Sequence, residues 1–170
     1  MPITSEKPLL NDASMSILDG HTQVIAANLD KNHSYLQDHK IDGVPILPAA
    51  VALEIMAEAV AFLWPTWQVS EVLDCRLLKG IEVKENGYPI NIVVEPIDSN
   101  SEEVIELSVR IESTHDQTLP RLHYRSSIRL QKQALSSFTH TPGAYTEKKL
   151  TVQKDYSKWL FHGPRFQVIE

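Results

Sequence analysis

The chain has a single cysteine, no internal repeat and no long apolar run near its N-terminus. Because Cys75 has no second cysteine to pair with, an internal disulfide is excluded, which is typical of proteins from a reducing compartment. Residues 1–14 lack the apolar core of a secretory signal peptide. We therefore expect a cytoplasmic protein.

Several sequence signatures of common sites are also absent. There is no Gly-rich phosphate-binding loop, no G-x-S-x-G sequence and no nicotinamide fingerprint. The seven histidines are scattered, and none has a metal-ligand spacing to another histidine or to Cys75. The most apolar stretch, residues 44–64, contains two glutamates and two prolines, so it predicts a buried helix and not a membrane span. We expect no metal and no tightly bound cofactor.

The charge is acidic overall and unevenly distributed. Sixteen Lys and Arg residues face 22 Asp and Glu residues, a net charge of −6 that argues against a general nucleic-acid binder. Residues 1–120 have a net charge of −12, whereas residues 121–170 have a net charge of +6. The basic end either meets an acidic partner, such as a carrier protein, or is an ordinary solvated face.

The segment most clearly predicted to be helical lies between two prolines. Pro48 lies where a helix tolerates the missing N–H, and Pro65 ends the segment. The sequence between them predicts a helix over residues 49–63 that is apolar nearly all round. A helix of this kind belongs inside a protein, so we expect it to be almost wholly buried.

Beyond this helix the apolar period changes from 3.6 to 2, which is typical of strands. Strands are predicted for residues 22–29, 69–78, 89–95, 105–111 and 122–130. Turn-forming residues between the later strands predict an antiparallel meander. The result is an α+β fold in which a sheet wraps around one helix. Residues 132–150 have no period and predict a linker to a new element over 152–170.

His39 is the first candidate for chemistry. It precedes a Gly/Pro loop that leads into the predicted helix, where the backbone amides near Ala49 and Ala50 are free to donate. An imidazole beside such donors suits removal of a proton next to a thioester carbonyl, while the amides hold the developing enolate oxygen. The alternative is a histidine that only satisfies loop hydrogen bonds.

Two segments carry a family resemblance. The segment from His39 to Pro48 matches the HxxxGxxxxP motif of polyketide synthase dehydratase domains, and residues 160–167 resemble the YGPxFQ motif of the same family. The similarity is greatest to the dehydratase-type domains of polyunsaturated fatty acid synthases. Because both motifs occur in the right order, the resemblance covers nearly the whole chain beyond residue 20.

The resemblance implies a hotdog fold that is the first half of a double hotdog. Residues 1–20 would be an N-terminal extension, 21–131 the hotdog, 132–150 a linker and 151–170 the start of a second hotdog. In this family the first half supplies the catalytic histidine, here His39. The resemblance places the catalytic aspartate in the second half, beyond residue 170.

The resemblance also implies the residues that contact substrate. Those implied to bind substrate or its oxyanion are Gly43, Pro48, Ala49, His162, Gly163 and Pro164. Two of them depart from the usual pattern, because Ala49 replaces a glycine and His162 replaces a tyrosine. Glu54 occupies the position of the acid in free-standing, single-hotdog dehydratases, where it faces the histidine of the other protomer. A solvated helix glutamate is the alternative for Glu54.

The implied function is removal of water from a 3-hydroxyacyl thioester on a phosphopantetheinyl acyl carrier protein, giving a 2-enoyl thioester. The expected partners are that carrier and a second hotdog half or a homodimer partner. The departures at Ala49 and His162 favour one alternative, a non-catalytic structural or carrier-docking hotdog. A hotdog thioesterase is the other alternative; it requires a carboxylate to activate water.

Overall fold

The computed structural model describes residues 9–97, 103–114, 119–132 and 162–166. The predicted linker over 132–150 lies outside these residues except for Lys132, and so does most of the segment over 151–170. The fold is therefore described from the N-terminal strands, the central helix, the main sheet and the short segment around Gly163.

The central helix α2 spans Ala49–Leu63, as the two prolines predict. Pro48 is the N-cap, with extended backbone angles, and the Trp64 amide donates to the Val60 carbonyl at the C-terminal end. The buried side chains of the helix are Ala52, Ile55, Met56, Glu58, Ala59 and Val60. The prediction of near-complete burial was too strong, because Ala49, Ala50 and Glu54 are exposed.

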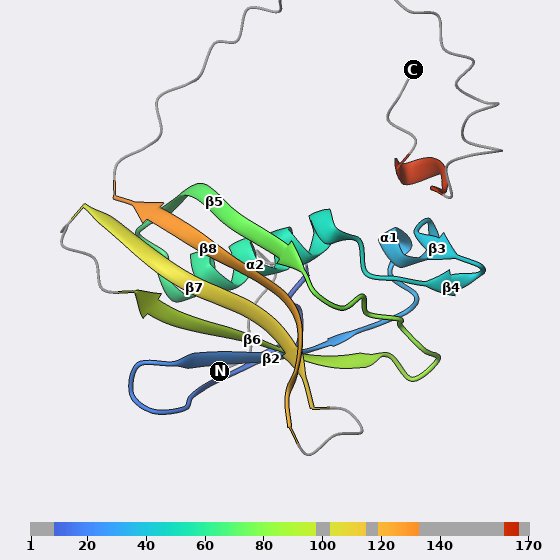
Figure 1. Ribbon diagram of the computed structural model, residues 1–170, viewed down its shortest axis with the longest axis horizontal. Coiled ribbons are helices and arrows are strands. Elements are labelled where there is room, and N and C mark those ends of the chain that lie inside the picture. Colours follow the sequence, from blue (N-terminus) through green and yellow to red (C-terminus); the bar gives the residue numbers. More distant parts are fainter. Residues whose placement is uncertain (1–8, 98–102, 115–118, 133–161, 167–170) are drawn as a thin grey trace, which may run out of the picture.

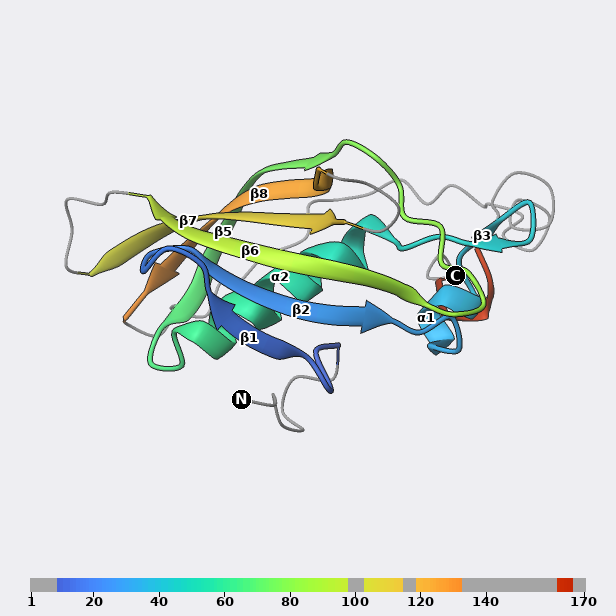
Figure 2. The same ribbon diagram turned by 90° about the horizontal axis from the view of Figure 1, so that it is seen from below.

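One six-stranded antiparallel sheet curves around α2 (Figures 1 and 2). Its strands lie in the order β1-β2-β6-β7-β8-β5. Their bounds are β1 Ser14–Ile17, β2 Gln23–Leu29, β5 Gln68–Leu77, β6 Tyr88–Ile97, β7 Val104–Ser113 and β8 Arg121–Gln131. The alternating residues Leu107, Val109 and Ile111 of β7 are fully buried in the core beneath the sheet, as their period predicts. A helix held in a curved sheet is the predicted hotdog arrangement.

The sheet differs from the predicted meander in two places. Strands β6, β7 and β8 follow one another as expected, but β5 pairs with β8 at the far edge and not with β6. A period of 2 indicates which face is buried and does not specify the neighbouring strand. Strand β1 lies within the predicted N-terminal extension, pairs with β2, and is preceded by the buried residues Leu10 and Ala13. The sheet therefore begins before residue 21.

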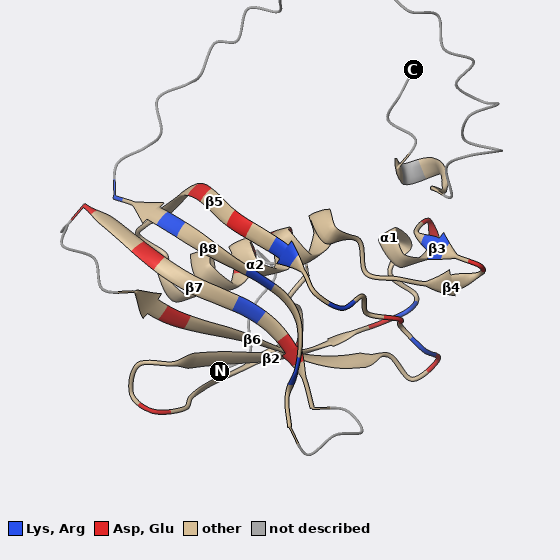
Figure 3. Cartoon of the chain, viewed as in Figure 1, with Lys and Arg blue, Asp and Glu red and all other residues tan. Residues whose placement is uncertain are grey.

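Charged residues of both signs lie along strands β5 to β8 of the sheet (Figure 3). Arg129 on β8 donates to Glu106 on β7 at 3.0 Å and to Glu71 on β5 at 2.9 Å. Arg110 on β7 forms an ion pair with Glu95 on β6 at 2.8 Å. Within the described part of the basic C-terminal region, Arg129 is thus paired with acidic side chains, as on a solvated face. Within the described residues, no helix is long and apolar enough to cross a membrane.

A cluster of hydrogen bonds around the buried His123 connects β8 to neighbouring elements. His123, at an irregularity in the β7–β8 register, is 1% exposed, and its Nδ1 donates to the Lys79 carbonyl at 3.0 Å. Its Nε2 lies 2.8 Å from Ser113 Oγ, which in turn lies 3.0 Å from the Tyr88 hydroxyl. Because Nδ1 donates to a carbonyl, the neutral ring accepts at Nε2 and the cluster is satisfied. Burial lowers the pKa of His123, and the nearby cations Arg121 and Lys79 act in the same direction.

We expect this cluster to make the fold less stable in mild acid. Because the pKa of His123 is lower in the folded chain, the unfolded chain binds the proton more readily, so stability falls as the pH drops below about 6.5. Urea unfolding at pH 7.5 and pH 5.5 measures the loss, which is at most about 1.4 kcal/mol per pH unit for one proton. The His123→Gln variant should show a smaller pH dependence, whereas the exposed His21→Gln control should keep it. Equal slopes in wild type and His123→Gln would contradict the assignment.

Candidate active site

The first motif forms a small hairpin that precedes α2 in the chain. The helical turn α1 (Ser34–Gln37) leads to β3 (Lys40–Ile41), which pairs with β4 (Val44–Pro45). Asp42 and Gly43 form the two-residue turn with φ values of 50° and 81°. Positive φ at both positions is the geometry that favours glycine. This backbone geometry gives Gly43 a role in shaping the hairpin that follows His39.

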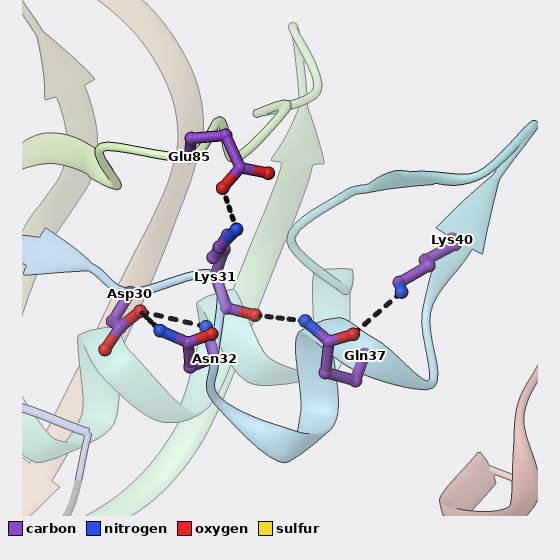
Figure 4. A network of polar contacts seen from close by, with 6 residues as sticks. All are labelled: Asp30, Lys31, Asn32, Gln37, Lys40 and Glu85. Carbon is purple, nitrogen blue, oxygen red and sulfur yellow. Dashed lines mark hydrogen bonds and ion pairs between the residues drawn. The ribbon is translucent and has the colours of Figure 1, made fainter.

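A polar network anchors the segment leading to this hairpin (Figure 4). Lys31, after β2, forms an ion pair with Glu85, and its carbonyl accepts a hydrogen bond from Gln37 Nε2 at 2.7 Å. Lys40 Nζ then donates to Gln37 Oε1 at 2.7 Å. Gln37 and Lys40 flank His39 in sequence, so the network connects α1 and β3 to the turn before β6.

The His39 ring is fixed by a backbone carbonyl. Its Nδ1 lies 2.8 Å from the Ile46 carbonyl oxygen, and the Ile46 amide donates back to the His39 carbonyl at 3.0 Å. A carbonyl can only accept, so Nδ1 carries the proton and Nε2 of the neutral ring carries the lone pair. The ring is half-buried. This arrangement presents a defined tautomer that is able to accept a proton at Nε2.

The second motif meets His39 directly. His162 forms an isolated antiparallel bridge with His39, and their ring centroids are 5.6 Å apart. The Phe166 ring, in the short 3-10 turn Pro164–Phe166, lies 5.7 Å from the His39 ring. The two motifs that the resemblance identified are thus brought together, although Pro164 itself is exposed.

Gly163 allows this close approach. Its amide donates to the Asp38 carbonyl at 2.7 Å. A Cβ added at Gly163 would lie 2.8 Å from Asp38 Cα and 2.6 Å from Asp38 Oδ1, both closer than real Cβ contacts. The glycine of the second motif is therefore explained by backbone-to-backbone packing against the residue before His39.

The start of α2 follows the His39 loop. Pro48 is buried, whereas Ala49 and Ala50 are exposed, and the first intrahelical bond runs from the Ala52 amide to the Pro48 carbonyl at 2.9 Å. The amides of the first turn lie N-terminal to that bond, so they have no acceptor within the helix and carry the positive end of its dipole. Ala49, unlike a proline, keeps a backbone N–H at this exposed position.

The two helix glutamates have different surroundings. Glu54 is exposed one turn into α2. Glu58 is 7% exposed, and its Oε2 accepts a hydrogen bond from the Leu9 amide at 3.1 Å. Glu58 thus ties the segment before β1 to the helix. No group of side chains suited to hold a metal ion occurs among the described residues.

Two contacts of the site were not predicted from the sequence. One is the Ile46 carbonyl that fixes His39, and the other is Tyr124 on β8, whose hydroxyl donates to the Leu47 carbonyl at 2.9 Å. Every residue has a backbone carbonyl, so the sequence does not show which carbonyl will accept a hydrogen bond from a given side chain. Tyr124 did carry a signal, because a tyrosine at an inward position of a strand needs a partner for its hydroxyl.

Comparisons with known proteins identify relatives of this chain. The family model of the polyketide synthase dehydratase domain matches residues 7–112. One relative, a polyunsaturated fatty acid synthase component from Thraustochytrium sp., is 26% identical over 143 residues, covering 82% of this chain and 5% of that protein. The chain therefore spans a small part of the length of this curated relative.

Solved dehydratase structures share the fold. The dehydratase domain from the CurF module of curacin polyketide synthase gives a TM-score of 0.72 at 19% identity, covering 95% of this chain and 60% of that one. A variant of the PpsC dehydratase domain from Mycobacterium tuberculosis gives 0.64 at 21% identity, covering 95% and 57%. Such coverage fits the first hotdog half of a longer domain. By its sequence over residues 7–112, the chain belongs to the polyketide synthase dehydratase domain family.

Proposed function

We propose that the chain supplies the catalytic histidine of a dehydratase that acts on a 3-hydroxyacyl thioester carried by an acyl carrier protein. The observation that carries this proposal is the His39 ring, whose Nδ1 is held by the Ile46 carbonyl so that Nε2 can accept a proton. The contacts with His162 and Phe166 support it, because they enclose the same ring between the two motifs.

The proposed reaction is an elimination of water. His39 Nε2 takes the proton from C2 of the acyl chain, and the electron pair passes through the thioester enolate. The amides at Ala49 and Ala50 stabilise the enolate oxygen. The pair then forms the C2–C3 double bond as the C3 hydroxyl leaves with a proton from an acid, giving water and a 2-enoyl thioester. No cofactor is needed, because the thioester itself makes the C2 proton removable.

In this proposal the acid comes from a second hotdog half, as the family resemblance implies. The alternative acid is Glu54 of a partner protomer, and its exposure on α2 leaves it accessible to such a partner. The carrier protein supplies the substrate through its phosphopantetheine arm, so the proposed partners are the carrier and the second half or protomer.

The reaction is tested by incubating a 3-hydroxyacyl carrier protein with the natural protein and measuring the carrier by mass spectrometry. We expect the acyl group to lose one water and to stay attached to the carrier. Release of a free acid would indicate the thioesterase, and carrier binding without turnover would indicate the docking domain.

The 170-residue chain assayed by itself should turn over more slowly than the same chain combined with a second hotdog half, by on the order of 10²–10⁴-fold, because in this proposal the acid belongs to that second half. The Glu54→Ala variant of this chain is the control for the alternative acid. Robust turnover that survives Glu54→Ala would place a different acid within these 170 residues and contradict the proposed acid.

A further inference from the structure

Tyr124 is a buried tyrosine that reaches from the main sheet to the loop before α2. It lies on β8, is 0% exposed, and its hydroxyl donates to the Leu47 carbonyl at 2.9 Å across 77 residues of sequence. Burial raises the pKa of Tyr124 to about 12, so the hydroxyl keeps its proton and remains a donor at neutral pH. The residue thus donates a hydrogen bond to the backbone just before the N-cap Pro48.

This hydrogen bond completes the anchoring of the loop that carries the His39 acceptor. The Leu47 amide donates to the Ile81 carbonyl at 3.0 Å, and the Val83 amide donates to the Pro45 carbonyl at 2.9 Å. The Ile46 carbonyl, between these two anchored residues, is the one that holds His39 Nδ1. Tyr124 therefore fixes the peptide next to the carbonyl that orients the imidazole.

The same loop sets where α2 begins. Leu47 and Pro48 are both buried, and the Pro48 carbonyl accepts the first intrahelical hydrogen bond. The Leu47 carbonyl precedes the helix, so an intrahelical amide does not satisfy it, and the Tyr124 hydroxyl does. The Tyr124 hydroxyl therefore restrains the position of the His39 ring relative to the first amides of α2.

We propose that Tyr124 is a positioning residue for the dehydration reaction, acting through the Leu47 carbonyl on the His39 ring and the start of α2. This inference rests on the proposed function. Without the hydroxyl, the Leu47 carbonyl is buried beside a phenyl ring, and the loop shifts to find another donor. Small displacements of a base from its substrate lower kcat strongly while leaving most substrate contacts in place.

The test compares Tyr124→Phe with Tyr88→Phe in the intact natural protein. Both variants remove one phenol hydroxyl that forms a hydrogen bond inside the fold. Tyr88, however, bonds to Ser113 and His123, whereas Tyr124 bonds to the Leu47 carbonyl. We expect Tyr124→Phe to lower kcat on the order of 10- to 100-fold with KM changed less than about twofold. Tyr88→Phe should lower the melting temperature while leaving kcat within about twofold of wild type.

A second measurement does not depend on turnover. In the 170-residue chain labelled with ¹⁵N-histidine, the His39 Nδ1 proton should exchange with water about an order of magnitude faster in Tyr124→Phe than in wild type or Tyr88→Phe. Unchanged exchange, or equal kcat losses in the two variants, would overturn the positioning role. A Tyr124→Phe chain that does not fold would assign the hydroxyl to sheet stability and overturn it as well. An inactive wild type with the expected exchange difference would refute the proposed function but retain the loop anchor.

Discussion

Replacing His39 by alanine in the intact protein should abolish dehydration and leave the fold nearly unchanged. If His39 is the base at C2, as proposed, its loss removes at least the general-base contribution, on the order of 10²–10⁴-fold in rate. The folded state loses one hydrogen bond to the Ile46 carbonyl from a half-buried ring, which costs about 1 kcal/mol. The measurements are enoyl product on the carrier by mass spectrometry and a melting curve of the same sample.

His39→Asn provides the matched control for this result. The asparagine side-chain amide can donate to the Ile46 carbonyl as Nδ1 does, but it offers no basic nitrogen. We expect this variant to melt closer to wild type than His39→Ala does and to be as inactive. A variant that melts normally and still produces the enoyl thioester would show that His39 is not the base, and the carrier-docking interpretation would then lead.

Gly163→Ala should have the second large effect. The added Cβ would lie 2.8 Å from Asp38 Cα, a backbone atom that cannot move aside without moving the neighbouring His39. We expect the two motifs to separate and turnover to fall on the order of 10²-fold, as for a displaced catalytic group. Product formation by the intact protein measures the effect, together with nuclear Overhauser contacts between the His39 and His162 rings.

Gly80→Ala is the control for Gly163→Ala. A Cβ at Gly80 would lie 3.9 Å from the Ile46 side chain, which is an ordinary van der Waals contact. This variant therefore adds the same methyl group near the same loop without a collision, and its turnover should stay close to that of wild type. If Gly163→Ala retained both full turnover and the ring contact, the close approach would not be needed for catalysis.

The elements with a strong apolar period were predicted well. The helix over residues 49–63 was found from Pro48, Pro65 and the run between them, and β7 was found from its alternating residues. Strand β1 was missed because it has four residues, most of them exposed, and therefore no apolar period. The place of β5 at the sheet edge was missed because its pairing with β8 is set by tertiary packing.

The sequence predicted the side chains of the site but not the backbone groups that hold them. The motif resemblance placed His39 and His162 in one site, and the structure brings their rings together. It gave no indication that the Ile46 carbonyl selects the tautomer or that Tyr124 holds the next peptide. Both contacts depend on backbone groups, whose positions follow from the folded chain and not from residue identity.

The pairing of His39 with His162 also has a consequence for folding kinetics. The two residues are 123 positions apart (162 − 39), whereas the pair Pro96–Leu107 in the β6–β7 hairpin is 11 apart (107 − 96). Contacts between distant positions form late, because the entropy lost in closing a long loop precedes any stabilisation from the contact. We expect refolding to restore the circular dichroism of the sheet before the His39–His162 contact. Catalytic competence would then be acquired in a separate, slower phase, after the sheet has enclosed its helix.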